Sequence, residues 1–130
     1  MNHKLIMASS AIILGIIGIT CSFLPLELAE QLALSGKNSI LLIQIAGALF
    51  FGFAMVNWTA KGTLIGGIYN KPISLGNFVH FTIGAITLIK ASVQMEQLSV
   101  TFLILTLVYV TFAVLFGLIN FRHPIQEKSQ

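Results

Sequence analysis

The sequence predicts an all-α protein, an integral membrane four-helix bundle with up-down-up-down topology and a short amphipathic helix in its first outer loop. Two observations on composition support this: 56% of the 130 residues are hydrophobic and only 8% are charged, whereas a soluble domain carries about a quarter charged residues. The third observation is a set of four apolar segments of about 20 residues, the length that a helix needs to cross the hydrocarbon of a bilayer. Lipid offers the backbone no hydrogen-bond partners, so such segments span a membrane as helices.

The predicted spans leave almost no residues for a soluble domain, so we expect a single membrane domain over residues 1–130. The spans cover about residues 5–24, 40–60, 75–93 and 98–121. The first has a signal peptide as its alternative, although its apolar run is longer than the usual signal core. The third is the weakest, because Asn77, His80 and Lys90 interrupt it. A re-entrant or tilted segment is the alternative for that span.

The connections between the spans differ in composition. The first outer loop, PLELAEQLALSGKNS, alternates leucine with glutamate and glutamine at helical spacing, which predicts a short surface helix capped by Gly36. The stretch KGTLIGGIYNKPISLGNFVHF contains the second connection. There, Gly66 and Gly67 permit the positive φ of a tight turn, and Pro72 suits the start of the next helix.

Cationic residues near the predicted span ends favour one orientation. With four spans, the two termini and the second loop share one side of the membrane. That side carries five cationic residues: Lys4, Lys61, Lys71, Arg122 and Lys128. The other side carries Lys37 and Lys90. Because cations near span ends collect on the cytoplasmic face, we expect a multi-pass membrane protein with both termini in the cytoplasm.

Each span also carries a stripe of small and polar residues at spacings of three and four, of the kind that packs helices together in lipid. In the first span the stripe is Ala8, Ala11, Gly15, Gly18 and Ser22. In the second it is Gln44, Ala48, Gly52, Met55 and Thr59. Similar stripes run from Asn77 to Gln94 and from Ser99 to Asn120. The sequence therefore predicts that these faces form the interior of the bundle.

Folding the four spans with this orientation brings polar and aromatic residues to a similar depth near the cytoplasmic face. We expect this set to bind a ligand or partner: Asn57, Trp58, Lys61, Lys71, Asn77, His80 and Asn120. An ionisable residue inside a span is a functional candidate by default. The alternative for His80 is a structural hydrogen bond that links helices, with Asn57 or Asn120 as the partner.

Two members of this set have further interpretations. Trp58, at the end of a span, is typical of an aromatic anchor at the membrane interface. Lys61 and Lys71 lie beside the headgroups if the orientation is correct, where each attracts anionic lipid by on the order of 1 kcal/mol. The glycine pair between these lysines offers backbone N–H groups to a phosphate as an additional interpretation.

The sequence lacks the patterns of several functional classes. No Asp or Glu lies inside a span, which argues against the membrane-embedded carboxylate of small proton-coupled exporters. Paired catalytic carboxylates, a Ser-His-Asp set and a nucleotide-binding loop are missing. The histidines, His3, His80 and His123, have no carboxylate or thiol at ligand spacing, and Cys21 is the single cysteine. We therefore expect no catalytic residue, no metal, no cofactor and no nucleic-acid partner.

Three segments carry a resemblance to a known family. They are FLPLELAEQL after the first span, QIAGALFFGFAMVNWTAKG through the second and GGIYNKPISLGNFVHF into the third. In the order of these features, over about residues 20–90, the chain resembles the small four-span bacterial inner-membrane proteins of the DoxX-like kind and their relatives. The resemblance implies the topology and a location in the bacterial inner membrane, but no particular activity. Where those proteins often carry arginines at the cytoplasmic end of the second span, this chain has Lys61.

The functional expectation is a non-enzymatic membrane protein that binds a protein partner or a lipid-like small molecule. One alternative is a small transporter or channel subunit that acts as a homo-oligomer. Another is an accessory subunit of a quinone-linked membrane redox enzyme, in which a partner supplies the cofactor.

Overall fold

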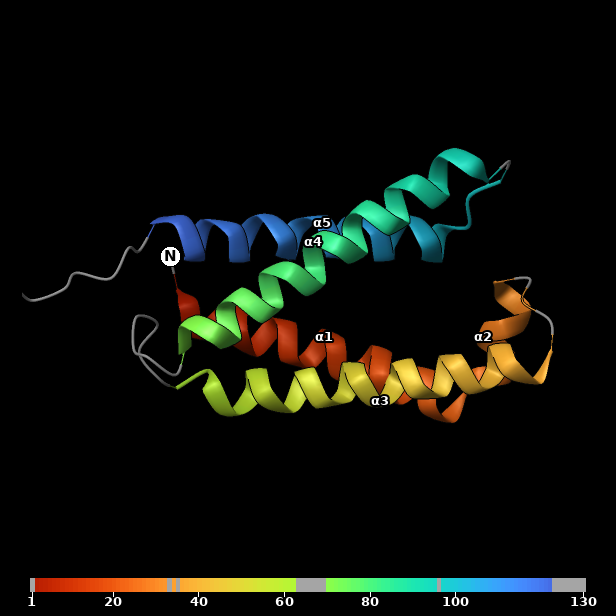
Figure 1. The fold of residues 1–130 in the computed structure, drawn as a ribbon, viewed down its shortest axis with the longest axis horizontal. Helices are drawn as coiled ribbons and strands as arrows, with labels where there is room; N and C mark the ends of the chain where they lie inside the picture. The colour runs from red at the N-terminus through yellow and green to blue at the C-terminus, as the bar shows by residue number, and fades with distance from the viewer. Residues whose placement is uncertain (1, 33, 35, 63–69, 96, 123–130) are drawn as a thin grey trace, which may run out of the picture. The chain divides into compact units, whose positions relative to one another are not determined.

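Five helices make up the regular structure of the residues that the computed structural model describes, which are 2–32, 34, 36–62, 70–95 and 97–122. The helices are α1 (His3–Phe23), α2 (Pro25–Gln31), α3 (Lys37–Ala60), α4 (Asn70–Gln94) and α5 (Val100–Arg122), as Figure 1 shows. All except α2 are long and apolar enough to cross a membrane. The predicted all-α fold, with four long apolar helices and a short helix after the first, is confirmed.

The sequence explains where several of these helices begin and end. Asn2 caps α1 by accepting a hydrogen bond from the backbone N–H of Leu5 at 3.3 Å. Pro25 then stands at the start of α2, where its missing N–H removes no helical bond. Ser99 accepts a hydrogen bond from the backbone N–H of Phe102 at 3.2 Å and so satisfies a free donor in the first turn of α5.

The role of Gly36 in the structure differs from the predicted one. It was expected to cap the short surface helix, but α2 ends at Gln31 and Gly36 is the residue before α3. Its φ of 102° lies in the left-handed region, which favours glycine because other residues are strained there. Gly36 therefore provides the backbone conformation through which the chain enters α3.

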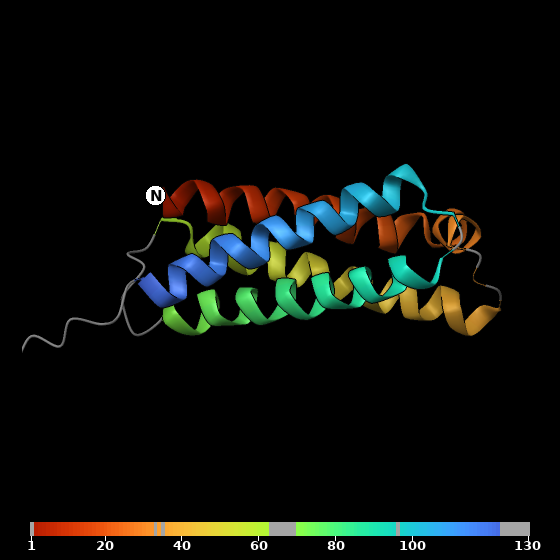
Figure 2. The same ribbon diagram turned by 90° about the horizontal axis from the view of Figure 1, so that it is seen from above.

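The chain divides into two compact units, residues 1–62 and 63–130. The first holds α1, α2 and α3, and the second holds α4 and α5. In each unit the two long helices are antiparallel neighbours, so each unit is a helical hairpin (Figures 1 and 2).

The N-terminal hairpin is held together by a close crossing of α1 and α3. A Cβ added to Gly18 would lie 2.7 Å from the backbone nitrogen of Phe51 and 2.9 Å from the carbonyl oxygen of Gly47. A Cβ added to Gly47 would lie 2.9 Å from the carbonyl oxygen of Gly18. The two backbones therefore touch at Gly18 and Gly47, because neither residue has a side chain to separate them.

The stripe predicted for the first span contributes Gly15, Gly18 and Ser22 to this crossing, whereas α3 meets α1 with a different face from the stripe predicted for the second span. The predicted α3 residues are exposed: Gln44, Ala48, Gly52, Met55 and Thr59. The buried residues of α3 are Gly47, Ala54, Asn57 and Ala60. Small residues occur on both faces of α3, and the close contact with Gly18 requires the face that carries Gly47.

The C-terminal hairpin has an aromatic core. The ring of Phe81 on α4 stacks on Phe112 and Phe116 of α5, with centroid distances of 4.9 and 5.7 Å. Phe81 and Phe116 have no exposed surface. A Cβ added to Gly117 would contact the Phe78 ring at 3.2 Å, so this glycine lets a large ring lie close to the α5 backbone.

The third predicted span is a single unbroken helix of 25 residues, α4. It begins at Asn70, before the apolar run at Leu75, so Pro72 lies within its first turn, where proline is tolerated. The turn predicted at Gly66 and Gly67 and the fraying predicted beyond Pro124 lie outside the described residues.

Candidate functional site

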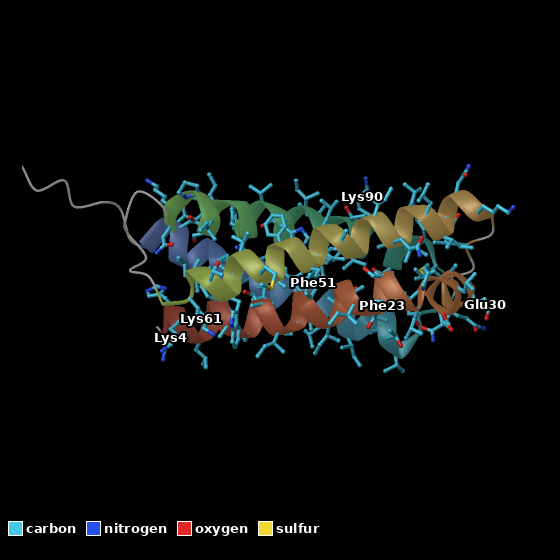
Figure 3. All side chains as sticks on the ribbon, turned by 90° about the horizontal axis from the view of Figure 1, so that it is seen from below. Lys4, Phe23, Glu30, Phe51, Lys61 and Lys90 are labelled. Carbon is cyan, nitrogen blue, oxygen red and sulfur yellow. The ribbon has the colours of Figure 1, made fainter. Side chains whose placement is uncertain are left out.

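The end of the N-terminal hairpin where α1 begins and α3 ends carries two lysines and a tryptophan. Lys4 is in the first turn of α1, and Lys61 follows the last residue of α3. The Lys61 ammonium lies over the face of the Trp58 ring, 2.7 Å from its centroid, in a cation–π contact. Figure 3 shows Lys4 and Lys61 next to each other at this end, and Glu30 at the other.

The electrostatics of Lys61 reflect this arrangement. Partial desolvation lowers the pKa of the Lys61 ammonium from its ordinary value, and the positive charge of Lys4 lowers it further. Trp58 keeps 47% of its surface exposed. The position therefore combines two neighbouring cations with an accessible aromatic ring, which suits an anionic group at a membrane interface.

Asn57, one turn before Lys61, has a different environment. Its side chain is fully buried, and its amide nitrogen donates to the Ser10 hydroxyl at 3.0 Å. Ser10 is also fully buried and donates to the backbone carbonyl of Met7 at 2.9 Å. This relay joins α3 to α1 and satisfies polar groups that would be costly to bury alone.

The two predicted asparagines of the C-terminal hairpin also donate within their own unit. Asn77 is fully buried and donates to the carbonyl of Ile73 at 2.9 Å. Asn120 donates to the carbonyl of Ser74 on α4 at 3.1 Å and to Phe116 on its own helix at 2.8 Å. Asn120 thus links the two helices, and this favours a stabilising role for that amide.

His80 lies against an aromatic residue that the sequence reading had not named as its partner. Its Nε2 is 3.3 Å from the Tyr109 hydroxyl, and the two ring centroids are 5.5 Å apart. A Cβ added to Gly84 would overlap the Tyr109 ring, so the glycine makes room for this tyrosine. The pair joins α4 to α5, which agrees with the structural alternative for His80. Asn120 was predicted as a partner, but the hydrogen bonds that the structure places on its amide go to backbone carbonyls instead.

The seven predicted residues therefore fall into two groups. Asn57, Trp58 and Lys61 belong to the N-terminal hairpin, and Lys71, Asn77, His80 and Asn120 belong to the C-terminal one. Lys71 is exposed on the first turn of α4.

Sequence reasoning did not include Lys4 or Tyr109 in the site. Lys4 could have been found from the orientation argument, because that argument placed Lys4 and Lys61 on one side of the membrane. Tyr109 belongs to the small and polar stripe of the fourth span, but its spacing alone does not show that it meets His80.

Among the residues that the structure describes, no three His, Cys, Asp or Glu side chains are grouped so that they could hold a metal ion. Comparison of the chain with protein-family models, curated proteins and solved structures finds no match. The resemblance to DoxX-like proteins stays a prediction.

Proposed function

We propose that this chain is a non-enzymatic, multi-pass protein of a bacterial inner membrane that binds a lipid-like molecule or a protein partner through its cytoplasmic end. The observation that carries the proposal is the uneven charge of the N-terminal hairpin. Lys4 and Lys61 lie at one end, and Glu27 and Glu30 on α2 lie at the other together with Lys37.

The dimensions of the helices support membrane insertion. The long helices have 21 to 25 residues, which at about 1.5 Å per residue gives about 32–38 Å. This length matches a hydrocarbon core of about 30 Å with short extensions into the headgroups. Large apolar side chains are exposed along these helices, among them Ile16, Leu42 and Ile83. In a bilayer such side chains would face the acyl chains.

The charge distribution supports the orientation. Cations next to a span are retained on the cytoplasmic side, whereas Asp and Glu contribute little. The end with Lys4, Lys61 and the exposed Trp58 would therefore face the cytoplasm, with the tryptophan at the level of the headgroups. The short helix α2 would lie at the outer surface.

Cysteine labelling tests this topology. In a Cys21→Ser background, Gly62→Cys and Glu30→Cys place a thiol at opposite ends of the N-terminal hairpin, and Gly62 has open space for a side chain. A membrane-impermeant maleimide added to spheroplasts should label Glu30→Cys, and it should label Gly62→Cys only after the membrane is opened. Lys37→Cys, at the start of α3, is a matched control that should behave like Glu30→Cys. Labelling of both ends from the same side would refute the topology.

Native mass spectrometry tests the binding part of the proposal. Protein extracted from its membrane in mild detergent should carry a lipid or a partner protein in a defined stoichiometry. A bare monomer under conditions that preserve other membrane complexes would contradict the proposal.

A second candidate function, a small transporter or channel subunit, rests on the His80–Tyr109 pair. Both side chains lie on helices proposed to span the membrane, and an ionisable residue in such a place often marks a transport pathway. Ion or proton flux in proteoliposomes that falls in His80→Phe but not in Thr87→Val would support this candidate. If neither variant changes the flux, the histidine acts only in packing.

A further inference from the structure

Among the described residues, no carboxylate balances the charge of the lysine end of the N-terminal hairpin. The acidic residues among those described are Glu27 and Glu30, and both lie on α2 at the far end of the hairpin (Figure 3). Lys4 and Lys61 therefore have no carboxylate beside them in the described part of the chain. Two ammonium groups near each other repel, and an anion between them removes that repulsion.

The geometry of Lys61 restricts where such an anion would sit. Trp58 and Lys61 are three residues apart, so they lie on the same face at the end of α3. The indole covers one side of the ammonium. The Lys61 ammonium carries three N–H donors, and Lys4 adds three donors from α1. A phosphate, with several acceptor oxygens and a negative charge, matches this donor set.

The surroundings indicate a lipid as the source of the phosphate. Leu5, next to Lys4, is 66% exposed, and Met55 and Val56, just before Trp58, are 50% and 44% exposed. These apolar side chains continue from the cationic end along the long helices. A ligand with a charged head and hydrocarbon chains would contact both parts, whereas free phosphate would use only the lysines.

We propose that Lys4, Trp58 and Lys61 form a binding site for the phosphate of an anionic phospholipid, whose acyl chains lie along the exposed apolar faces of α1 and α3. The proposal rests on the proposed membrane insertion, because the headgroup layer at this end supplies the ligand. It refines the lipid-binding part of the proposed function by assigning the residues and the chemical class of the ligand.

Lipid titration by native mass spectrometry tests the site. Delipidated protein is titrated with phosphatidylglycerol, and the bound fraction is compared between the wild type, Lys4→Ala, Lys61→Ala and the double variant. A lysine near a headgroup contributes a factor of about five in affinity. Each single variant should therefore bind about fivefold more weakly, and the double variant about 25-fold more weakly. Trp58→Leu should weaken binding about twofold or more, because the ring no longer positions the ammonium.

Lys37→Ala and Lys90→Ala are the matched controls, because Lys37 is exposed at the other end of the N-terminal hairpin and Lys90 is exposed on the other hairpin. They should change the affinity by less than twofold. Lys61→Arg should keep most of the binding, since it retains the positive charge. A double variant that binds like the wild type, or a Lys37→Ala or Lys90→Ala variant that loses as much as Lys61→Ala, would overturn the site.

The choice of ligands separates the sources of the phosphate. Phosphatidylcholine should bind more weakly than phosphatidylglycerol, because it has no net charge. Displacement of the lipid by millimolar inorganic phosphate would overturn the lipid assignment in favour of a free anion.

A failure of this site can be distinguished from a failure of the proposed function. If the double variant retains phosphatidylglycerol as well as the wild type does, the site is refuted while lipid binding stands. If the wild type retains neither lipid nor partner protein, the proposed function itself is refuted.

Discussion

Replacement of Gly18 by alanine is the sharpest test of the N-terminal hairpin. The added Cβ would lie 2.7 Å from the Phe51 backbone nitrogen and 2.9 Å from the Gly47 oxygen, where ordinary contacts are 3.4–4 Å. Both neighbours are backbone atoms that no rotamer change can move, so α1 and α3 must separate locally by about 0.5–1 Å. A gap of that size loses about a quarter to a half of each contact's attraction.

The expected magnitude follows from two opposing effects. Overpacking of a close interface costs about 1–3 kcal/mol. Alanine recovers up to about 1 kcal/mol through its better helix propensity. The net destabilisation of Gly18→Ala should therefore be up to about 2 kcal/mol, which is a factor of up to about 30 in the unfolding equilibrium.

Gly52→Ala is the matched control on α3, because a Cβ there has nothing within 4 Å. It should leave the free energy of unfolding unchanged or raise it by up to about 1 kcal/mol. Reversible unfolding in mixed micelles with increasing SDS, followed by circular dichroism, measures both variants. If Gly18→Ala is as stable as Gly52→Ala, the close crossing of α1 and α3 is not a feature of the folded protein.

Two further variants test the interior of each hairpin by the same unfolding measurement. Asn57→Ala removes the donor to Ser10 and should cost about 1 kcal/mol, as for other hydrogen bonds between membrane helices. Thr59→Ala, whose hydroxyl bonds only carbonyls of its own helix, should cost less, and equal losses would argue against the link to α1. Phe81→Ala removes the ring at the centre of the aromatic core and should cost about 3–5 kcal/mol. Ile83→Ala, at a 60% exposed position, should cost well under half of that, and a similar loss would refute the assigned core.

The number and approximate limits of the long helices could be predicted because each contains a long apolar segment that is visible in the sequence. The limits differ mainly at α4, which begins at Asn70 rather than near Leu75. Polar residues continue a helix beyond its apolar part, since helical hydrogen bonds do not depend on hydrophobic side chains. A prediction from apolar content alone therefore places the first residue of such a helix too late in the sequence.

The packing faces were harder to predict. In α3 the sequence offers Gly47 and Ala54 on one face and Ala48 and Gly52 on another, and spacing does not distinguish them. The choice depends on the surface of α1, where Gly18 admits the opposite backbone. The contact of His80 with Tyr109 was missed for a similar reason: the partner depends on how α4 and α5 are aligned lengthwise.

The direction of the hydrogen bonds between helices has a consequence for biosynthesis. In each hairpin the donating amide is on the later helix and the acceptor on the earlier one: Asn57 donates to Ser10, and Asn120 donates to the carbonyl of Ser74. The ribosome makes the chain from the N-terminus, so each of these amides is translated after the acceptor that it will use. A nascent chain can therefore pair each amide as soon as the later helix of its hairpin has formed, and no later segment is required for these two bonds.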